Sequence, residues 1–292
     1  MHKITPCLWF NDNAEEAVKF YTSILKNSKK GKASRYGEGA PMPKGTVLTV
    51  TFQIEGQEFL ALNGGPYFKF TPAISLFVQC KTEHDIDDLF KKLSSGGEIL
   101  MPLDKYPFSE KYAFVKDKFG VAWQLMLTHT QQHIAPCLLF VGKDHGKAEA
   151  AIRFYTSVFK HASVQHLHHY EEGEGTQVGT VKHASFLLEG QEFMAMDGAG
   201  AHAFTFNESI SFVVNCKTQK EIDYYWEKLS KGGAKVQCGW LKDKFGISWQ
   251  VVPTIISEML TDKNAEKSSR VMQAILKMKK LDIKSLKQAY AG

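Results

Sequence analysis

Short runs in which apolar and polar residues alternate are the commonest pattern in the chain, and they predict β-strands. Over residues 47–54, Leu48, Val50 and Phe52 alternate with polar residues, which is the period of a half-buried strand. The apolar run over residues 4–10 predicts a strand nearer the start of the chain.

A helix is predicted between these two strands. Asn13 is a typical N-cap residue, a glutamate follows three positions later, and apolar residues then recur at helical spacing. The order of one strand, one helix and about three antiparallel strands begins again at residue 74, where Thr82 caps the second helix and Gly96-Gly97 ends it. The pattern therefore predicts βαβββ units.

The two halves of the chain repeat one another. Glu55-Gly-Gln-Glu-Phe59 returns unchanged at 189–193, and Lys116-Asp-Lys-Phe-Gly120 returns at 242–246. Self-similarity of this kind indicates a tandem duplication. We expect one domain over residues 1–130, a second over residues 131–254, and a helical tail over residues 255–292.

The fold class that follows is α+β. We expect each domain to consist of two βαβββ modules that form a curved, mostly antiparallel sheet around a cup, with the helices outside and the C-terminal helical tail added at the end. The concave side of such a sheet is the default place for a small ligand.

Several longer motifs resemble one family. They are Thr5-Pro-Cys-Leu-Trp-Phe10, Glu16-Ala-Val-Lys-Phe-Tyr21, Ala61-Leu-Asn-Gly-Gly-Pro66 and Gln237-Cys-Gly-Trp-Leu-Lys-Asp-Lys-Phe-Gly246. With them the chain resembles the vicinal-oxygen-chelate superfamily of glyoxalases, bleomycin-resistance proteins and extradiol dioxygenases, and within it the PhnB-like branch labelled 3-demethylubiquinone 3-methyltransferase-like. The resemblance implies the tandem glyoxalase-like fold and, in many members, a divalent metal in the cup.

The metal ligands that the resemblance implies are missing. Where a histidine is usual on the first strand, the chain has Thr5 and Ala135, and where a glutamate is usual on the last strand it has Gln124 and Gln250. The fourth strands offer Phe59, Ala61 and Asn63, or Phe193, Ala195 and Asp197. A zinc or iron site needs about three His, Asp, Glu or Cys ligands. We therefore predict neither a metal nor another cofactor.

Strand parity selects the residues that face the cup. Trp123 and Leu125 should pack under the helices, which leaves Gln124 facing the cup. With the equivalent strand positions and two strand ends, the predicted ligand-binding residues are Cys7, Trp9, Asn63, Gln124, Cys137, Asp197, Cys238, Trp240 and Gln250. No catalytic residue is assigned.

Structural alternatives stay open for these candidates. A buried glutamine can be hydrogen-bonded across the sheet, and Asn63 and Asp197 precede glycines, where they can cap a turn instead. Cys238 has no histidine neighbour in sequence that would lower its pKa and activate it as a nucleophile. Cys80 and Cys216 keep step with apolar residues and are expected in the core.

Two other features carry weaker signals. His166 and His168 would share one strand face, which can bind a metal or can simply form a solvated strand edge. The pairs Gly37-Glu-Gly39 and Gly173-Glu-Gly175 lack the third glycine of a dinucleotide loop. These residues therefore give no support to a nucleotide or methyl-donor loop.

The net charge of +5 is located mainly in the tail. Residues 255–292 contain 8 basic and 4 acidic residues, and 8 − 4 = +4. Apolar residues at helical spacing predict that this tail docks on the body rather than binding nucleic acid or membrane. The five scattered cysteines and the absence of a long apolar segment favour a cytoplasmic protein.

Two functions are compatible with these observations. The first is binding or sequestration of a small organic ligand in a metal-free cup, or non-metal chemistry there. The alternative is a metal-dependent enzyme of the glyoxalase or dioxygenase type with unusual ligands. A third hypothesis makes the first copy a structural partner of the second. The identity of the ligand, enzymatic activity and assembly into a homodimer stay open.

Overall fold

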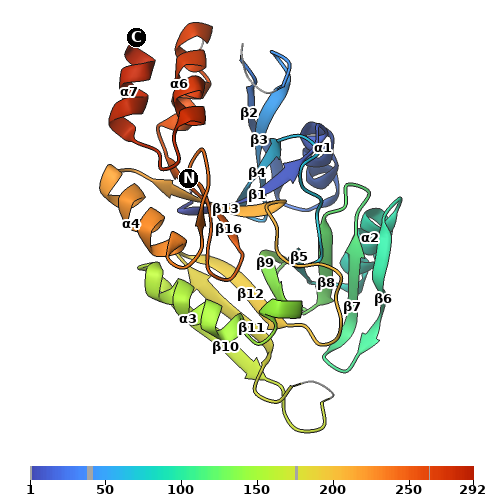
Figure 1. Cartoon of the computed structure of the whole chain (residues 1–292). Coiled ribbons are helices and arrows are strands. Elements are labelled where there is room, and N and C mark those ends of the chain that lie inside the picture. Colours follow the sequence, from blue (N-terminus) through green and yellow to red (C-terminus); the bar gives the residue numbers. More distant parts are fainter. Residues whose placement is uncertain (1, 38–41, 175–176, 263) are drawn as a thin grey trace.

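The computed structural model describes residues 2–37, 42–174, 177–262 and 264–292. Four βαβββ modules follow one another, and a helical tail ends the chain (Figure 1). Module 1 comprises β1 (Ile4–Phe10), α1 (Ala14–Ile24), β2 (Ser28–Arg35), β3 (Val47–Ile54) and β4 (Gln57–Asn63). Module 2 comprises β5 (Ile74–Cys80), α2 (Glu83–Ser94), β6 (Glu98–Tyr106), β7 (Ser109–Lys116) and β8 (Ala122–Leu127).

The second half repeats this order with shorter final strands. Module 3 comprises β9 (His133–Phe140), a 3-10 turn (Gly142–Asp144), α3 (Ala148–Val158), β10 (Ala162–His169), β11 (Val181–Leu188) and β12 (Gln191–Asp197). Module 4 comprises β13 (Ile210–Cys216), α4 (Gln219–Ser230), β14 (Ala234–Lys235), β15 (Trp240–Lys242) and β16 (Ser248–Pro253). The tail comprises α5 (Ile256–Leu260), α6 (Ala265–Lys277) and α7 (Ile283–Ala291).

Two eight-stranded sheets arise by pairing modules from different halves. Sheet A joins modules 1 and 4 in the order β14-β15-β16-β13-β1-β4-β3-β2, and sheet B joins modules 2 and 3 in the order β10-β11-β12-β9-β5-β8-β7-β6. The predicted α+β class with two curved sheets and a helical tail is confirmed. The structure differs from the expectation in one respect: each cup takes one module from each half of the chain.

The strands of each sheet are mostly antiparallel, as predicted. The first and fourth strands of every module run parallel to each other, and the remaining neighbours are antiparallel. The joints between modules are the antiparallel pairs β1–β13 and β5–β9, where Thr5 lies opposite Val213 and Phe77 lies opposite Ala135.

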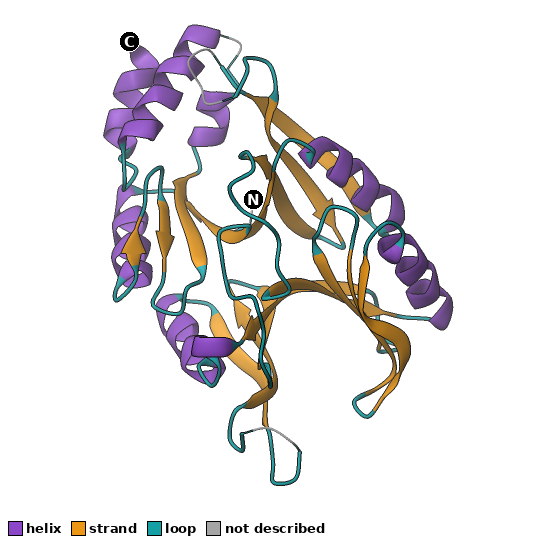
Figure 2. Cartoon of the chain, turned by 45° about the vertical axis from the view of Figure 1, so that its right-hand side comes forward, coloured by secondary structure: helices purple, strands orange, loops and turns teal. Residues whose placement is uncertain are grey.

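The main core lies between the convex faces of the sheets and the helices α1 to α4, which cover the outside (Figure 2). Trp123 and Leu125 are fully buried there, which confirms the predicted parity of β8. Cys80 and Cys216 also lie in this core, as predicted from their strand positions.

A buried carboxylate fastens the two modules of the first half. Asp117 follows β7, and its Oδ2 accepts hydrogen bonds from Tyr21 Oη at 2.7 Å and from Trp123 Nε1 at 2.8 Å. Its Oδ1 accepts from the backbone amides of Phe119 and Val121. Because Tyr21 belongs to module 1 and Trp123 to module 2, the carboxylate fixes the outer faces together and leaves β1 and β5 to pair with the other half.

Asp243 repeats this arrangement in the second half. Its Oδ2 accepts from Tyr155 Oη at 2.8 Å and from Trp249 Nε1 at 2.9 Å, and its Oδ1 accepts from the amides of Phe245 and Ile247. Burial raises the pKa of Asp243 to about 6, although the four donors act in the opposite direction.

The basic tail docks on the body through a second apolar cluster, as predicted. Val271, Leu281 and Leu286 are buried in it, and Cys238 and Val252 of module 4 pack against it. The backbone amide of Cys238 donates to the carbonyl oxygen of Met278 at 2.7 Å. In the part of the chain that the structure describes, no helix is both long and apolar enough to cross a bilayer.

Candidate functional site

Two tryptophans meet across the concave face of sheet A. Trp9 stands on β1 and Trp240 on β15, three strand spacings apart, or about 14 Å along the sheet. Their ring centroids are nevertheless only 5.6 Å apart, with the planes at 74°. The curvature of the sheet therefore brings the two indoles together, and both remain partly exposed.

The position of Trp9 is fixed by its neighbours. Its Nε1 donates a hydrogen bond to the carbonyl oxygen of Gly65 at 2.9 Å, and its ring packs edge-on against Phe68 with centroids 5.0 Å apart. Gly64 lies so close that an added Cβ would be 2.2 Å from the indole ring. The indole is thus held in place before any ligand arrives.

Below the indoles lies a polar floor. Gln250 on β16 is directly opposite Trp240 in register, and its Nε2 donates to Ser211 Oγ on β13 at 3.0 Å. The Cys7 thiol is fully buried beside both polar side chains, and this burial raises its pKa to about 12. Among the described residues, no donor bonds to the Oε1 atom of Gln250.

Sheet B has an equivalent floor with the same three residue types, glutamine, serine and cysteine, and with one additional tyrosine. Gln124 Nε2 donates to Ser75 Oγ at 2.8 Å, beside the buried thiol of Cys137, whose pKa burial raises to about 12. Here, however, Tyr112 Oη donates to Gln124 Oε1 at 2.7 Å. The amide of Gln124 is therefore satisfied within the protein.

The rest of the sheet B cup is filled by its own apolar side chains. Phe77, Tyr112 and Met194 are buried there, and Met101, Met126 and Met196 pack against them. Met126 follows Gln124 by two positions on β8, so the predicted cup-facing side of this strand is confirmed. The two cups are thus unequal.

Two of the predicted ligand-binding residues lie elsewhere. Asn63 Oδ1 accepts from the Ala14 amide at the start of α1 at 2.9 Å, and its Nδ2 donates to the carbonyl oxygen of Val47. Asp197 accepts from the amides of Gly146 and Val181 at 2.7 and 2.8 Å. Both residues are buried at strand ends and fasten local backbone, which is the turn alternative stated above.

Cys238 also lies apart from the polar floor. It precedes β15, adopts a left-handed backbone conformation with φ of 61°, and packs against the tail. Burial raises its pKa. By register it takes the place that Tyr112 has in sheet B, because Trp240 and Phe114 lie opposite Gln250 and Gln124 respectively.

Sequence reasoning missed Ser75, Ser211, Tyr112 and Phe68. The two serines carry a detectable signal, because each stands second in a repeated strand motif, Ile74-Ser and Ile210-Ser, on the face opposite the core leucine and phenylalanine. Tyr112 lies in the part of the first half that carries extra residues, and its counterpart by register is Cys238 rather than a tyrosine, so the repeat gives no warning of its role. Phe68 lies in a loop, where strand parity does not apply.

The floors do not suit the divalent metal that the fold implies. Each contains a neutral glutamine amide, a serine hydroxyl and a thiol whose raised pKa keeps it protonated at neutral pH. Zinc and iron sites use thiolate, imidazole or carboxylate ligands. Among the described residues, no group of three or more His, Cys, Asp or Glu side chains is placed to hold a metal ion.

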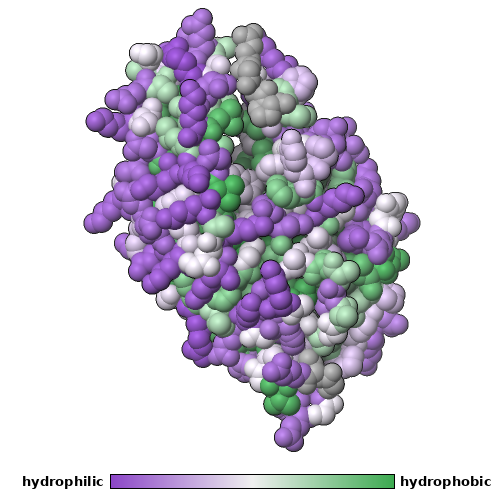
Figure 3. All heavy atoms as spheres, in the orientation of Figure 1, coloured by the Kyte–Doolittle hydropathy of each residue, from purple (hydrophilic) through white to green (hydrophobic). Residues whose placement is uncertain are grey.

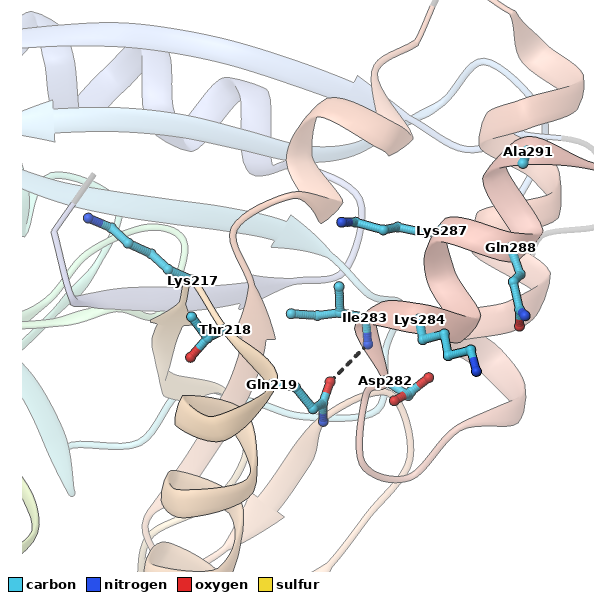
Figure 4. Close-up of a pocket in the computed structure, with 9 residues that line it drawn as sticks. All are labelled: Lys217, Thr218, Gln219, Asp282, Ile283, Lys284, Lys287, Gln288 and Ala291. Atoms are coloured by element: carbon cyan, nitrogen blue, oxygen red, sulfur yellow. Dashed lines mark hydrogen bonds between the residues drawn. The ribbon is translucent and has the colours of Figure 1, made fainter.

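A groove between α4 and α7 lies where the tail contacts the body, and we do not consider it a second candidate ligand site. The residues labelled in Figure 4 line it, and Gln219 Oε1 accepts from the Ile283 amide at 2.9 Å. Asp282 caps α7 through the Ser285 amide, and Thr218 caps α4 through the Glu221 amide. Each helix start thus already has a side-chain cap of its own.

The family described as 3-demethylubiquinone-9 3-methyltransferase matches residues 2–126 and 132–252. The chain belongs to this family. The two matches fall on modules 1–2 and modules 3–4, so this PhnB-like branch of the vicinal-oxygen-chelate superfamily occurs here twice in tandem. Gly39 and Gly175, the second glycines of the two pairs considered as methyl-donor loops, lie outside the described residues.

Solved structures of members and relatives of the family are similar to parts or most of the chain. A putative 3-demethylubiquinone-9 3-methyltransferase, the PhnB protein of Bacillus cereus, is 49% identical over 43% of this chain and 99% of its own, with a TM-score of 0.41. A glyoxalase I mutant from Zea mays is 13% identical over 88% of this chain and 94% of its own, with a TM-score of 0.55. The latter shows the shared fold alone. Among curated proteins no match is found.

The close contact at Gly64 leads to a first prediction. Gly64→Ala is expected to displace the Trp9 indole and to lower the free energy of unfolding by about 1–3 kcal/mol, because the new methyl group overlaps the ring. Urea denaturation and the tryptophan emission spectrum measure both effects. Gly37→Ala is the control, since a Cβ at Gly37 meets nothing within 4 Å. Equal stabilities of the two variants would contradict the prediction.

Proposed function

We propose that the protein binds a small planar organic molecule on the concave face of sheet A. The ligand packs against Trp9 and Trp240 and donates one hydrogen bond to Gln250. The observation that carries this proposal is the Oε1 atom of Gln250, which has no donor among the described residues, whereas its counterpart in sheet B has one. The side chain is only 8% exposed, but its Oε1 atom is not fully buried, so it is open to the cup and can accept a hydrogen bond from a ligand.

The tryptophans support an aromatic or otherwise planar ligand. Aromatic side chains supply large apolar contact areas and prefer offset or edge-to-face packing with other rings. Trp9 is held rigid by Gly65 and Phe68, so little conformational entropy is lost when a ligand packs on it. Figure 3 shows apolar side chains in the hollow between the tail and the strands β2 and β3, which form part of this cup.

Sheet A is the better candidate because in the cup of sheet B the glutamine is already hydrogen-bonded and apolar side chains fill the space. In sheet B, Tyr112 supplies the hydrogen bond that Gln250 lacks, and buried Phe77 and Met194 occupy the space above the floor. Both halves of the chain contribute one module to each cup. This sharing supports a joint role for the two copies over the hypothesis that one copy is a structural partner only.

The chemistry of the floor supports binding rather than catalysis. The Cys7 thiol has a pKa of about 12 and is therefore protonated at neutral pH, whereas nucleophilic cysteines act as thiolates. Among the residues that the structure describes, neither floor contains a carboxylate or imidazole for proton transfer. Sequestration of an organic molecule is thus the function that these residues support best.

A pair of probes tests this proposal. 2-Naphthol and naphthalene share one planar ring system, and only the former carries a donor. Gln250→Leu is expected to weaken binding of 2-naphthol about tenfold, because one hydrogen bond is lost, and to leave binding of naphthalene nearly unchanged. Equilibrium dialysis of the two compounds against wild-type and variant protein measures both affinities.

The second half of the chain provides the matched control. Gln124→Leu makes the same change in sheet B and should leave the affinity for 2-naphthol unaltered, since that floor is already paired. If Gln124→Leu weakens 2-naphthol binding as much as Gln250→Leu does, or if neither probe binds, the assignment of the ligand to sheet A is wrong.

A further inference from the structure

Three histidines share the concave face of sheet B near its β10 edge. His168 lies directly opposite His183 of β11, and His166 lies opposite Ser185. Ala184 and Phe186, which alternate with Ser185, belong to the main core on the convex side. Residues opposite one another in register share a face, so the imidazoles of His166, His168 and His183 all lie on the cup side.

Two of the imidazoles stand side by side, and the third belongs to the residue opposite one of them in register. The rings of His166 and His168 stand nearly parallel, at 10°, with centroids 6.4 Å apart. Register shifts occur on both sides, between Val164 and His166 and between His168 and His169, and such bulges re-aim side chains. Burial, followed by the neighbouring imidazole of His168, lowers the pKa of His183.

Two side chains on the same face of sheet B as this cluster carry a buried polar atom without a hydrogen-bond partner. Ser185 is buried next to it, and its Oγ has no hydrogen-bond partner. His133 Nε2 approaches Glu192 to 2.9 Å, but the direction of the contact is too poor for a hydrogen bond. A buried hydroxyl without a partner is unusual in a folded protein, and here it faces a group of metal-ligating side chains.

The internal repeat shows that the fold does not require these histidines. The segments align with an offset of 134 residues, as Glu55 with Glu189 shows, so Lys32, Ser34 and Thr49 occupy the same places in sheet A. Ser34 lies opposite Thr49 in register, and their hydroxyls are 2.6 Å apart. The same scaffold therefore accepts a simple hydroxyl pair where sheet B has two imidazoles.

We propose that His166, His168 and His183 form a site for a transition-metal ion such as Zn²⁺. Three neutral imidazoles are a common ligand set for zinc and leave its fourth position open. The three nitrogens would lie roughly 3.4 Å from one another around the ion. As placed now, the described side chains do not converge on a common point, so His166 and His168 must rotate toward each other when the ion binds.

This site differs from the metal position that the superfamily fold implies. That position is on the first and fourth strands of the modules, whereas β10 and β11 are the second and third strands of module 3. The inference is also independent of ligand binding on sheet A. Metal binding and naphthol binding can therefore fail separately.

Calorimetric titration of the untagged protein with ZnCl2 at pH 7.5 tests the proposal, with Co²⁺ absorption spectra as a second readout. We expect binding with a Kd below about 10 μM. His168→Ser and His183→Thr, which introduce the residues of sheet A, should each weaken Zn²⁺ binding at least tenfold or so. His84→Ala, which changes an exposed histidine on α2, should leave the affinity unchanged.

Thermal unfolding with EDTA present verifies that the variants fold, and His166→Lys provides a third variant on the same principle. A wild-type Kd for Zn²⁺ weaker than about 10 μM overturns the proposal. The proposal is also overturned if all three cluster variants bind Zn²⁺ as tightly as the wild-type protein does. Binding of phosphate at pH 6 without binding of Zn²⁺ at pH 7.5 would assign the cluster to an anion instead and likewise overturn it.

Discussion

Asp243→Ala is expected to lower the free energy of unfolding by about 3–5 kcal/mol. The substitution leaves the buried donors of Tyr155 and Trp249, together with two backbone amides, without an acceptor. It also removes the contact that joins the two modules of the second half. Urea denaturation at pH 7.5, followed by circular dichroism, measures the change.

Two other aspartates calibrate this prediction. Asp117→Ala removes the equivalent group of the first half and should destabilise to a similar extent. Asp87→Ala removes a carboxylate that is 51% exposed and pairs with Lys111, so it should cost less than about 1 kcal/mol. A loss from Asp243→Ala no larger than that from Asp87→Ala would show that the carboxylate does not join the modules.

Leu281→Asp is expected to release the tail from the body and to expose Cys238. Leu281 is 1% exposed, and its side chain lies beside Gly239. A buried carboxylate without a partner is strongly unfavourable, so the tail should undock instead. The rate at which a thiol reagent modifies Cys238 should then rise tenfold or more, roughly in line with local opening, because loss of burial also brings its raised pKa back toward the usual range.

The other cysteines make this experiment specific. Cys7, Cys80, Cys137 and Cys216 are fully buried in the body, so they should stay unreactive while the body is folded. Adding Cys238→Ser to Leu281→Asp should abolish the fast reaction with the thiol reagent. Lys279 is exposed, so Lys279→Asp should leave the tail docked and should not produce the fast reaction. A reaction rate that Leu281→Asp leaves unchanged would mean that the tail does not protect this thiol.

The module order and the cup-facing residues of the strands could be predicted because they depend on local pattern. Trp123 and Gln124 alternate between core and cup as period-two patterning requires. Parity fails on β4, where the apolar run from Phe59 to Asn63 has similar residues on both faces. The pattern there cannot show which face is concave, so the sequence leaves both a ligand contact and a turn role open for Asn63.

The pairing of the modules could not be predicted, since it depends on contacts between distant residues. All four first strands have nearly the same apolar pattern, so any two of them could form the central antiparallel pair. The choice is made by the contacts of Tyr21 with Asp117 and of Tyr155 with Asp243, which span 96 and 88 residues. The inequality of the cups could not be predicted either, because Tyr112 is replaced by Cys238 in the second half and its bond to Gln124 depends on the register of β7 with β8.

Because each sheet takes modules from both halves, the two sheets can be completed only one after the other as the chain is synthesised. Sheet B needs only residues up to Asp197, whereas β1 must wait for β13, which begins at Ile210, before its second edge is paired. Because chains emerge from the ribosome N-terminus first and non-local pairing is slow, sheet B can close while β1 still has an open edge. The cup that we propose as the binding site is therefore the last part of the body to be completed.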